Sequence, residues 1–207
     1  MFKLWLPLAG SWLLMGAEGP TFSWFVASLP EQKINLASFG SIAFPISLVV
    51  EGPIIMLLAA STALCKDIKS YYKLRQFTIF LACALTVIHA LIAFTPLYDW
   101  LVNSILAVPK NLHEPGRLGL QILTPWTAAI AYRRFLQGVL IRFERAHFIV
   151  IGTVIRLAAL IGCLKLFSTF TEFSGIAIGT IAISAGVIAE AIFTHAVSRN
   201  TVKNTIP

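Results

Sequence analysis

Charged side chains are scarce in this sequence. They make up 12% of its 207 residues, whereas hydrophobic residues make up 57%. A soluble domain has about 25% charged and about 45–50% apolar residues. A soluble chain of the present composition would expose large apolar patches to water, so an ordinary soluble globular domain is excluded. A membrane protein has no such difficulty, because its outer surface faces lipid.

Acidic residues are scarcer than basic ones, with nine Asp and Glu against sixteen Lys and Arg and a formal net charge of +7. In a soluble protein this balance would suggest a nucleic-acid partner. Here the basic residues stand mainly in short segments between apolar runs, where they report the orientation of a membrane protein. We therefore expect no nucleic-acid binding.

Cysteines and enzyme motifs are also few. The three cysteines, Cys65, Cys83 and Cys163, are odd in number and lack zinc-type spacing, so no disulfide framework and no metal site are implied. The sequence has no phosphate loop, no metalloprotease helix and no G-x-S-x-G elbow. We expect no enzyme activity, no cofactor and no metal. The nearest approach to a lipid-modifying enzyme site is the pair His113 and Glu114.

What the sequence has is a series of long apolar segments, and six of them reach the length of about 20 residues that a membrane-spanning helix needs. We predict an all-α fold, a polytopic membrane helix bundle of about six transmembrane helices in one domain over residues 1–207. The predicted helices cover residues 4–29, 34–65, 77–102, 118–141, 148–167 and 173–197. The lipid bilayer is therefore the expected surrounding of an integral, multi-pass protein.

The N-terminus has some features of a signal peptide, with Lys3 before the apolar run Leu4–Met15 and small residues at Gly16 and Ala17. However, apolar residues continue through 21–26, which a short cleaved signal does not require. We expect a retained first helix, with cleavage as the alternative.

Lysine and arginine are unevenly divided between the two sides of the predicted bundle. With both termini in the cytoplasm, the inner set is Lys3, Lys66, Lys69, Lys73, Arg75, Arg133, Arg134, Arg142, Arg145, Arg199 and Lys203. The outer set is Lys33, Lys110, Arg117 and Lys165, and Arg156 lies within a helix. This excess inside predicts a cell (inner or plasma) membrane protein with both termini cytoplasmic.

Two acidic residues, Glu18 and Glu51, fall at bilayer depth, where a charge costs roughly 2.5–3.5 kcal/mol or more unless it faces a cavity or a partner. At a rise of 1.5 Å per residue, both lie roughly 20 Å from the inner surface. If they face each other, at least one holds a proton at neutral pH, which makes them candidate proton- or cation-coupling residues. The alternative is two separate protonated acids, each bonded to a backbone carbonyl.

The same arithmetic places Arg156 and Glu190 at one level, roughly 12 Å from the inner surface. We predict a buried ion pair between them that joins the fifth and sixth helices. Such pairs are more often architectural than catalytic.

Prolines follow both intramembrane acids, with Pro20 close to Glu18 and Pro53 close to Glu51. A proline removes a helical donor and frees a carbonyl one turn back, which in a membrane lines a water-filled path or finds another partner. These positions fit helices that bend as the proton state of the acid changes. Static packing of kinked helices is the alternative.

Five further polar residues are candidates for lining a cavity. Ser47 shares a helix face with Glu51, and Thr124, Thr127 and Arg134 lie along one stripe of the fourth predicted helix. His89 is a lone histidine within the third predicted helix, where a hydrogen-bonded core position is the more common role.

Two stretches of the sequence resemble a known transporter family. They are residues 38–46 followed by 51–64, and residues 123–126 followed by 132–142. They are similar to the second helix, and to the fourth helix with its cytoplasmic loop, in multidrug and toxic compound extrusion (MATE)-like and progressive-ankylosis-like proteins. These belong to a wider superfamily of flippases and exporters.

The resemblance implies alternating access between two six-helix lobes, with export driven by a proton or sodium gradient. Family members have twelve helices, whereas this chain has six predicted ones, so it resembles one lobe. Family cation sites use acidic residues on the first helices of a lobe, for which Glu18 and Glu51 are the candidates here. No residue-level motif supports the transfer to Glu18.

Three functions follow from these observations. The first is a secondary active transporter or flippase that acts as a parallel homodimer or with a second six-helix half, on a small-molecule or lipid-linked substrate. The second is a non-transporting scaffold or regulatory subunit with the same fold. The third is an integral membrane enzyme that acts on lipid.

Overall fold

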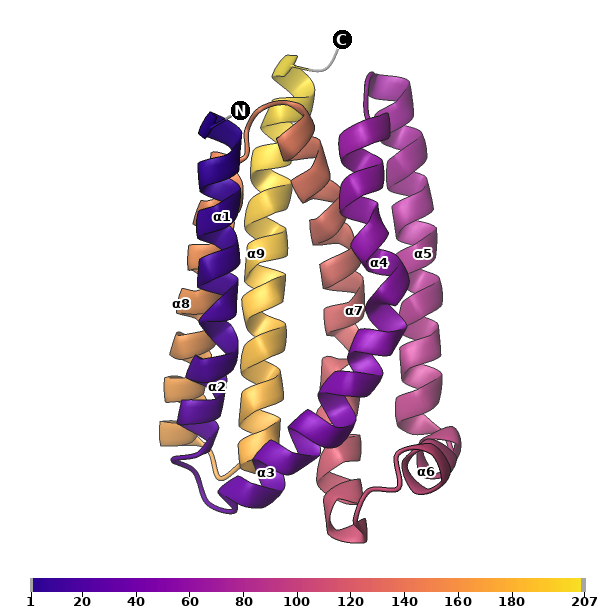
Figure 1. Ribbon diagram of the computed structural model, residues 1–207, viewed down its shortest axis with the longest axis vertical. Coiled ribbons are helices and arrows are strands. Elements are labelled where there is room, and N and C mark those ends of the chain that lie inside the picture. The colour runs from indigo at the N-terminus through magenta and orange to yellow at the C-terminus, as the bar shows by residue number, and fades with distance from the viewer. Residues whose placement is uncertain (1, 206–207) are drawn as a thin grey trace.

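The protein is a helical bundle in a computed structural model that describes the backbone of residues 2–205 and the side chains of residues 9–202 (Figure 1). The helices are α1 (Phe2–Gly16), α2 (Glu18–Val26), α3 (Gln32–Ser38), α4 (Phe44–Leu64), α5 (Ile68–Phe94), α6 (Leu97–Trp100), α7 (His113–Arg142), α8 (His147–Phe170) and α9 (Gly175–Thr205). π-Helical turns at Phe39–Ala43 and Leu101–Ile105 and a 3₁₀ turn at Lys110–Leu112 connect some of them. The predicted all-α fold class is confirmed.

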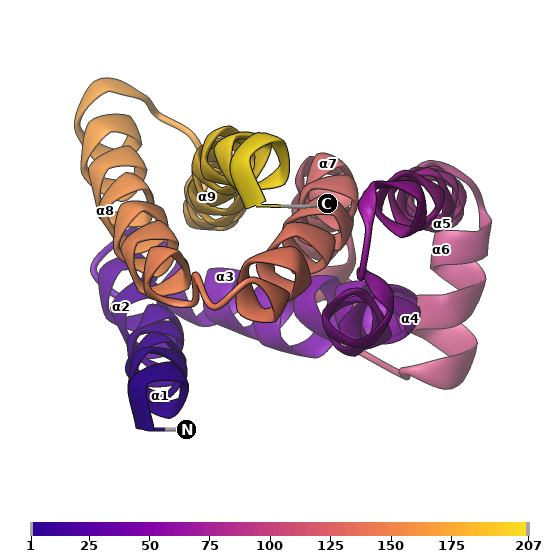
Figure 2. The same ribbon diagram turned by 90° about the horizontal axis from the view of Figure 1, so that it is seen from above.

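Across the described residues the long helices form six rods, because α1 and α2 stack end to end and α3 runs into α4 through the π-helical turn. Seen from above, α7 lies between α5 and α9, α8 packs on α9 and α1, and α4 packs on α5 and α7 (Figure 2). α1 to α4 thus lie largely on one side of the bundle. Residues 2 and 205 lie at the same end (Figure 1).

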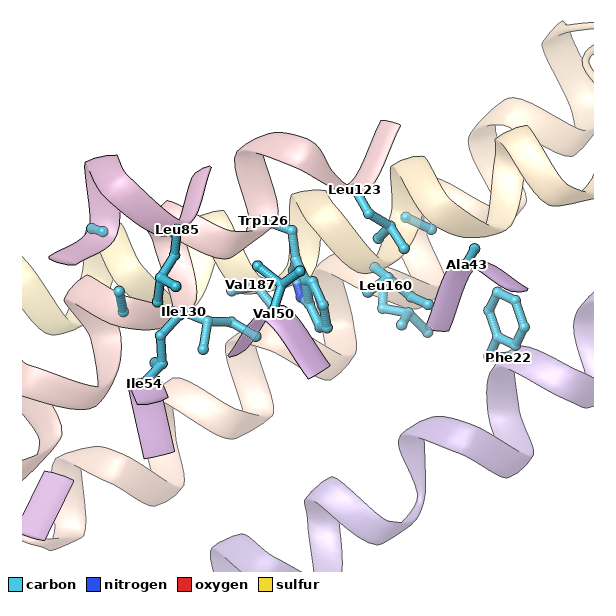
Figure 3. Packing of buried hydrophobic residues seen from close by; sticks show 14 of the residues in the cluster. Phe22, Ala43, Val50, Ile54, Leu85, Leu123, Trp126, Ile130, Leu160 and Val187 are labelled. Atoms are coloured by element: carbon cyan, nitrogen blue, oxygen red, sulfur yellow. The ribbon is translucent and has the colours of Figure 1, made fainter. Parts of the chain in front are cut away.

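Apolar side chains fill the centre of the bundle, and other apolar side chains cover its outside. Leu123, Trp126 and Ile130 of α7 pack with residues of the neighbouring rods in the main core cluster (Figure 3). On the outside, Val49 is 80% exposed and Phe80 is 72% exposed. An apolar exterior of this kind is what a bilayer accommodates and water does not.

Four rods are long and apolar enough by composition to span a membrane, among the residues described: 32–64, 68–94, 147–170 and 175–202. The first rod is divided at Ala17, and α7 carries several charged residues, including Arg133 and Arg134. Both nevertheless run alongside the other four (Figure 1). The protein is therefore an integral membrane bundle of six rods, in which the first rod is apolar but divided into two short helices and α7 is the rod with the most charged residues.

The third rod differs most from its predicted boundaries of 77–102, because it runs from Ile68 to Phe94. Its start is set by a capping box, in which Ser70 N donates to Asp67 Oδ1 over 2.7 Å and Asp67 N donates to Ser70 Oγ over 3.0 Å. The backbone N–H of Ser70 holds the pKa of the Asp67 carboxyl below its usual value. Three inner basic residues, Lys69, Lys73 and Arg75, consequently stand on a helix and not in a loop.

The segment after α5 is folded onto the end of the bundle opposite to the described chain ends (Figure 1). Tyr98 donates its hydroxyl to the carbonyl of His113 over 2.5 Å, and Arg117 pairs with Asp99 at 2.7 Å. Arg117 also lies 4.6 Å above the Tyr98 ring. His113 and Glu114, the nearest approach to an enzyme site in the sequence, are the first two residues of α7.

α4 and α7 approach most closely at Gly138. A methyl group at that position would lie 2.5 Å from the carbonyl oxygen of Leu58 and would overlap the side chain of Ser61. Because the backbone of α4 cannot yield as a flexible side chain does, only glycine fits at this crossing.

We expect Gly138→Ala to lower the free energy of unfolding by about 1–3 kcal/mol, since it overpacks the contact between α4 and α7. The matched control is Gly162→Ala in α8, where a methyl group meets no atom within 4 Å. This control should be neutral or stabilising, because alanine favours a helix over glycine. Unfolding by SDS titration in mixed micelles measures both. Equal stability of the two variants would contradict the close approach.

Candidate functional site

The most deeply buried charges among the described residues form a network centred on Glu190 of α9. Its Oε2 accepts from Arg133 Nη1 of α7 over 2.5 Å, and its Oε1 accepts from Gln137 Nε2 over 3.0 Å. Glu190 is fully buried and Arg133 is 1% exposed. Arg134 Nη1 extends the network by donating to Gln137 Oε1 over 3.4 Å.

A second ion pair joins the same network from the other side. Arg156 of α8 donates Nε to Glu18 Oε1 over 3.0 Å and donates Nη2 to Glu18 Oε2. Its remaining terminal nitrogen, Nη1, lies 3.8 Å from Glu190 Oε2. A bidentate arginine–carboxylate pair combines strength with fixed geometry. Arg156 therefore links α2, α8 and α9.

Two glycines allow α8 and α9 to approach at this network. A methyl group at Gly186 would lie 2.9 Å from the carbonyl oxygen of Arg156, and one at Gly152 would lie 3.3 Å from Cγ of Glu190. Each glycine thus stands opposite a charged residue of the facing helix. Without this close approach, the side chains of Arg156 and Glu190 would not share one level of the bundle.

Glu18 and Arg156 also border a cavity of about 230 Å³ between α2, α4 and α8. Most of its other walls are aromatic or apolar: Met15, Gly19, Phe22, Ser23, Phe39, Phe44, Trp126 and Ile183. The side chain of Glu18 remains 18% exposed, more than any other acid of the network. The charged network thus reaches an open space at this end.

Glu51 on α4 is placed differently. It is 5% exposed, and its Oε1 has no hydrogen-bond partner. The charges that act most strongly on it are those of Arg133, Arg134 and Arg156. Glu51 is therefore a buried acid beside the network that none of the hydrogen bonds of the described residues ties to an arginine.

The structure brings Arg156 and Glu190 together, but it does not bring Glu18 and Glu51 together. No hydrogen bond joins Glu18 to Glu51 among the described residues, because α2 presents Glu18 to Arg156 of α8. The predicted partners Arg156 and Glu190 lie at 3.8 Å, but the shorter contact of each is with another residue. Glu190 is bonded to Arg133, and Arg156 to Glu18.

The candidate cavity-lining residues lie within the bundle, and none of them lines the cavity beside Glu18. His89 is fully buried, with Nδ1 2.8 Å from Thr127 Oγ1 and Nε2 3.0 Å from the carbonyl of Leu120. Ser47 donates to the carbonyl of Ala43 over 2.8 Å, and Thr124 to that of Leu120 over 3.4 Å. Arg134 belongs to the network. His89 and Thr127 thus form a bridge between α5 and α7.

Arg133 is the network member that the sequence analysis assigned to the cytoplasmic surface. Two signals point to it in retrospect. Arg133 and Gln137 are four residues apart and so share a helix face. The predicted end of the fourth helix at 141 also places Arg133 roughly 12 Å deep, the level estimated for Arg156 and Glu190.

A solved structure of another protein has the same fold. It is described as the outward-facing conformation of a multidrug resistance MATE family transporter of the MOP superfamily. The likeness covers 99% of this chain and 45% of that chain, with a TM-score of 0.68 and 16% sequence identity. No protein-family model and no curated protein matches the sequence. The chain therefore has the fold of one half of a MATE transporter and spans about half its length, as the sequence resemblance implied.

We expect Glu190→Gln to lower the free energy of unfolding by about 3–5 kcal/mol, because it leaves the guanidinium of Arg133 buried without a counter-charge. Glu18→Gln should cost less than half as much, since Glu18 is partly exposed and Arg156 retains Glu190 nearby. SDS titration in mixed micelles compares the two variants with Glu172→Gln, an exposed acid outside the network. A larger loss for Glu18→Gln than for Glu190→Gln would show that the network is not centred on Glu190.

Proposed function

We propose that this chain forms one half of a membrane transporter that works by alternating access and is driven by a proton gradient. The observation that carries the proposal is the cavity beside Glu18, from which buried charged groups continue through Arg156 to Glu190 and Arg133. Charges at this depth are costly in lipid and are typical of ion and substrate pathways. The MATE fold supports the same proposal.

A second six-helix half completes the transporter in this proposal, and we favour a second copy of this chain. The matched transporter is about twice as long as this chain, so one copy supplies one half of its fold. Two copies that obey the same charge asymmetry share one orientation in the membrane, and a parallel homodimer results. A different six-helix partner would meet the same requirement.

We place the second half against the side formed by α1 to α4, because the cavity of Glu18 lies between α2 and α4 (Figure 2). The two cavities would then face a common path. Phe22, Phe39, Phe44 and Trp126 offer flat apolar surface, and the ion pair of Glu18 with Arg156 lies at the rim. A planar organic cation suits such a lining, since aromatic faces attract cations.

Glu51 is our candidate for the group that binds and releases the proton. When Glu51 loses its proton, its carboxylate competes with Glu190 for Arg133, the arginine of α7 that donates to Glu190. The contact between α7 and α9 would weaken while α4 is drawn toward α7. Pro53 and the π-helical turn at Phe39–Ala43 provide places where the α4 rod can bend.

We also propose that both ends of the chain face the cytoplasm in a cell (inner or plasma) membrane. The ends described at residues 2 and 205 lie at one end of the bundle, together with the connections that carry Lys66 and Arg145 (Figure 1). The excess of basic residues at this end supports the orientation.

A non-transporting scaffold with the same fold is the second candidate. It is favoured by the pairing of Glu18 and Glu190 with arginines, since these ion pairs hold the helices together and need no conformational change to do so. This candidate predicts a stable protein partner on purification and no flux through the reconstituted chain.

In proteoliposomes with an imposed pH gradient, we expect gradient-dependent accumulation of ethidium, a planar organic cation. Glu51→Gln should reduce it to near background, because the amide cannot release a proton while its shape is preserved. The control Glu172→Gln changes an exposed acid away from the site and should leave accumulation unchanged. Circular dichroism and gel filtration verify that each variant folds.

Full gradient-driven accumulation in Glu51→Gln would exclude Glu51 as the coupling residue. Accumulation that persists without a gradient would exclude proton coupling altogether. A wild-type chain that transports nothing and is purified with a stable partner would favour the scaffold.

The oligomeric state is a separate prediction, and we expect native mass spectrometry of the chain in lipid nanodiscs to give the mass of a dimer. Cys65 is fully buried and cannot report the contact, so a cysteine introduced at the 56% exposed Leu64 serves for crosslinking. Crosslinking at this inner position would support parallel halves. A monomer in nanodiscs would exclude the homodimer and direct attention to a different second half.

A further inference from the structure

A polar pocket of about 390 Å³ lies at the inner end of the bundle between α5 and α9, away from the Glu18 cavity. It is lined by Tyr71, Tyr72, Arg75, His195, Arg199 and Val202. Neither arginine has an acidic partner among the described residues. The Nε of Arg75 is buried without a hydrogen-bond acceptor. Two unpaired guanidinium groups at one pocket make it a site for an anion.

An apolar cavity of about 360 Å³ adjoins this pocket on the side of the membrane centre. Its lining comprises Ala129, Tyr132, Ile188, Ala191, Ile192 and His195. His195 borders both spaces, and its Nδ1 lies 2.7 Å from the hydroxyl of Tyr132, which fixes the position of the ring. The charged pocket and the apolar groove therefore meet at His195.

This groove faces outward and not into the bundle. Ile192 is 66% exposed and Tyr72 is 53% exposed. Ile188, Ile192, His195 and Arg199 recur every three or four residues and so form one stripe of α9. Glu190 is nine residues before Arg199, which at 3.6 residues per turn places it about 180° away. The groove is thus separated from the charged network by the body of α9.

We propose that the groove binds one anionic phospholipid from the inner leaflet, with its phosphate at Arg75 and Arg199 and an acyl chain along Ile188 and Ile192. From residue 188 to residue 199, α9 rises about 16 Å, which matches a headgroup and the upper part of a chain. Basic pockets between transmembrane helices are the expected sites for such headgroups. A free phosphate ion would use the pocket but not the apolar groove.

The lipid is a bound component of the bundle in this proposal, distinct from any transported substrate. It joins α5 to α9, between which no polar contact is found among the described residues; the nearby contact of Tyr132 with His195 joins α7 to α9. Its binding does not depend on proton coupling or on a second half.

The experiment is native mass spectrometry of the full-length chain in detergent, titrated with phosphatidylglycerol and separately with phosphatidylcholine. We expect one phosphatidylglycerol to bind preferentially. Each arginine removed should weaken it about fivefold, and the double variant Arg75→Gln/Arg199→Gln about 25-fold. The matched control Arg142→Gln/Arg145→Gln removes the same charge from the same end at exposed positions outside the pocket and should bind as the wild type does.

Equal binding of the two lipids, or equal weakening by the control pair, would overturn the proposal, because attraction by diffuse surface charge would then suffice. Displacement of phosphatidylglycerol by millimolar inorganic phosphate would indicate a free-anion site instead. Arg75→Lys/Arg199→Lys, which keeps the charge, should retain the preference for phosphatidylglycerol. Loss of that preference in a folded lysine variant would equally contradict phosphate binding by charge.

Discussion

A charged side chain inside a bilayer needs an opposite charge inside the bundle, and Glu190 is where this fold meets that requirement. Its carboxylate holds Arg133 and Gln137 of α7 and lies 3.8 Å from Arg156 of α8. α7 and α8 therefore both meet α9 at this one carboxylate. Because residues 152 and 186 are glycines, α8 and α9 approach closely enough for this arrangement. The polar composition of α7, which sets it apart from the other rods, has the same cause.

An architectural role of this network does not exclude a functional role. Arg156 belongs to the network through Glu190 and to the open cavity through Glu18, so any change at the cavity reaches α9 through one side chain. Buried ion pairs of this kind are costly to break by removing one partner. A rearrangement that exchanges partners, with every charge still compensated, costs less. In the proposed mechanism Glu51 is this exchange partner, because its Oε1 has no hydrogen-bond partner and the charge of Arg133 acts on it.

The sequence predicts the depth of these residues but not the direction in which they point. Helix lengths of about 20 residues and a rise of 1.5 Å per residue placed Arg156 and Glu190 at one level, and they do lie close together. The direction depends on helix rotation, so Glu18 was expected beside Glu51, whereas the face of α2 that carries Glu18 meets Arg156 of α8. Hydropathy does not locate a helix end that a local cap decides, as Asp67 and Ser70 do for the start of α5. Arg133 was missed because a cationic residue near a helix end is read as a topology signal.

α9 illustrates why an apolar segment in a membrane protein cannot be interpreted from its hydropathy alone. One face carries Glu190 and Gly186 into the charged network, and the opposite face carries Ile188, Ile192, His195 and Arg199 along the outer groove. The first face lies inside the bundle, while the second faces outward. In the proposal of a bound phospholipid, the same helix therefore connects the interior charges to the surrounding bilayer. A lipid held at Arg199 would restrict the position of α9, and with it the position of Glu190 relative to Arg133.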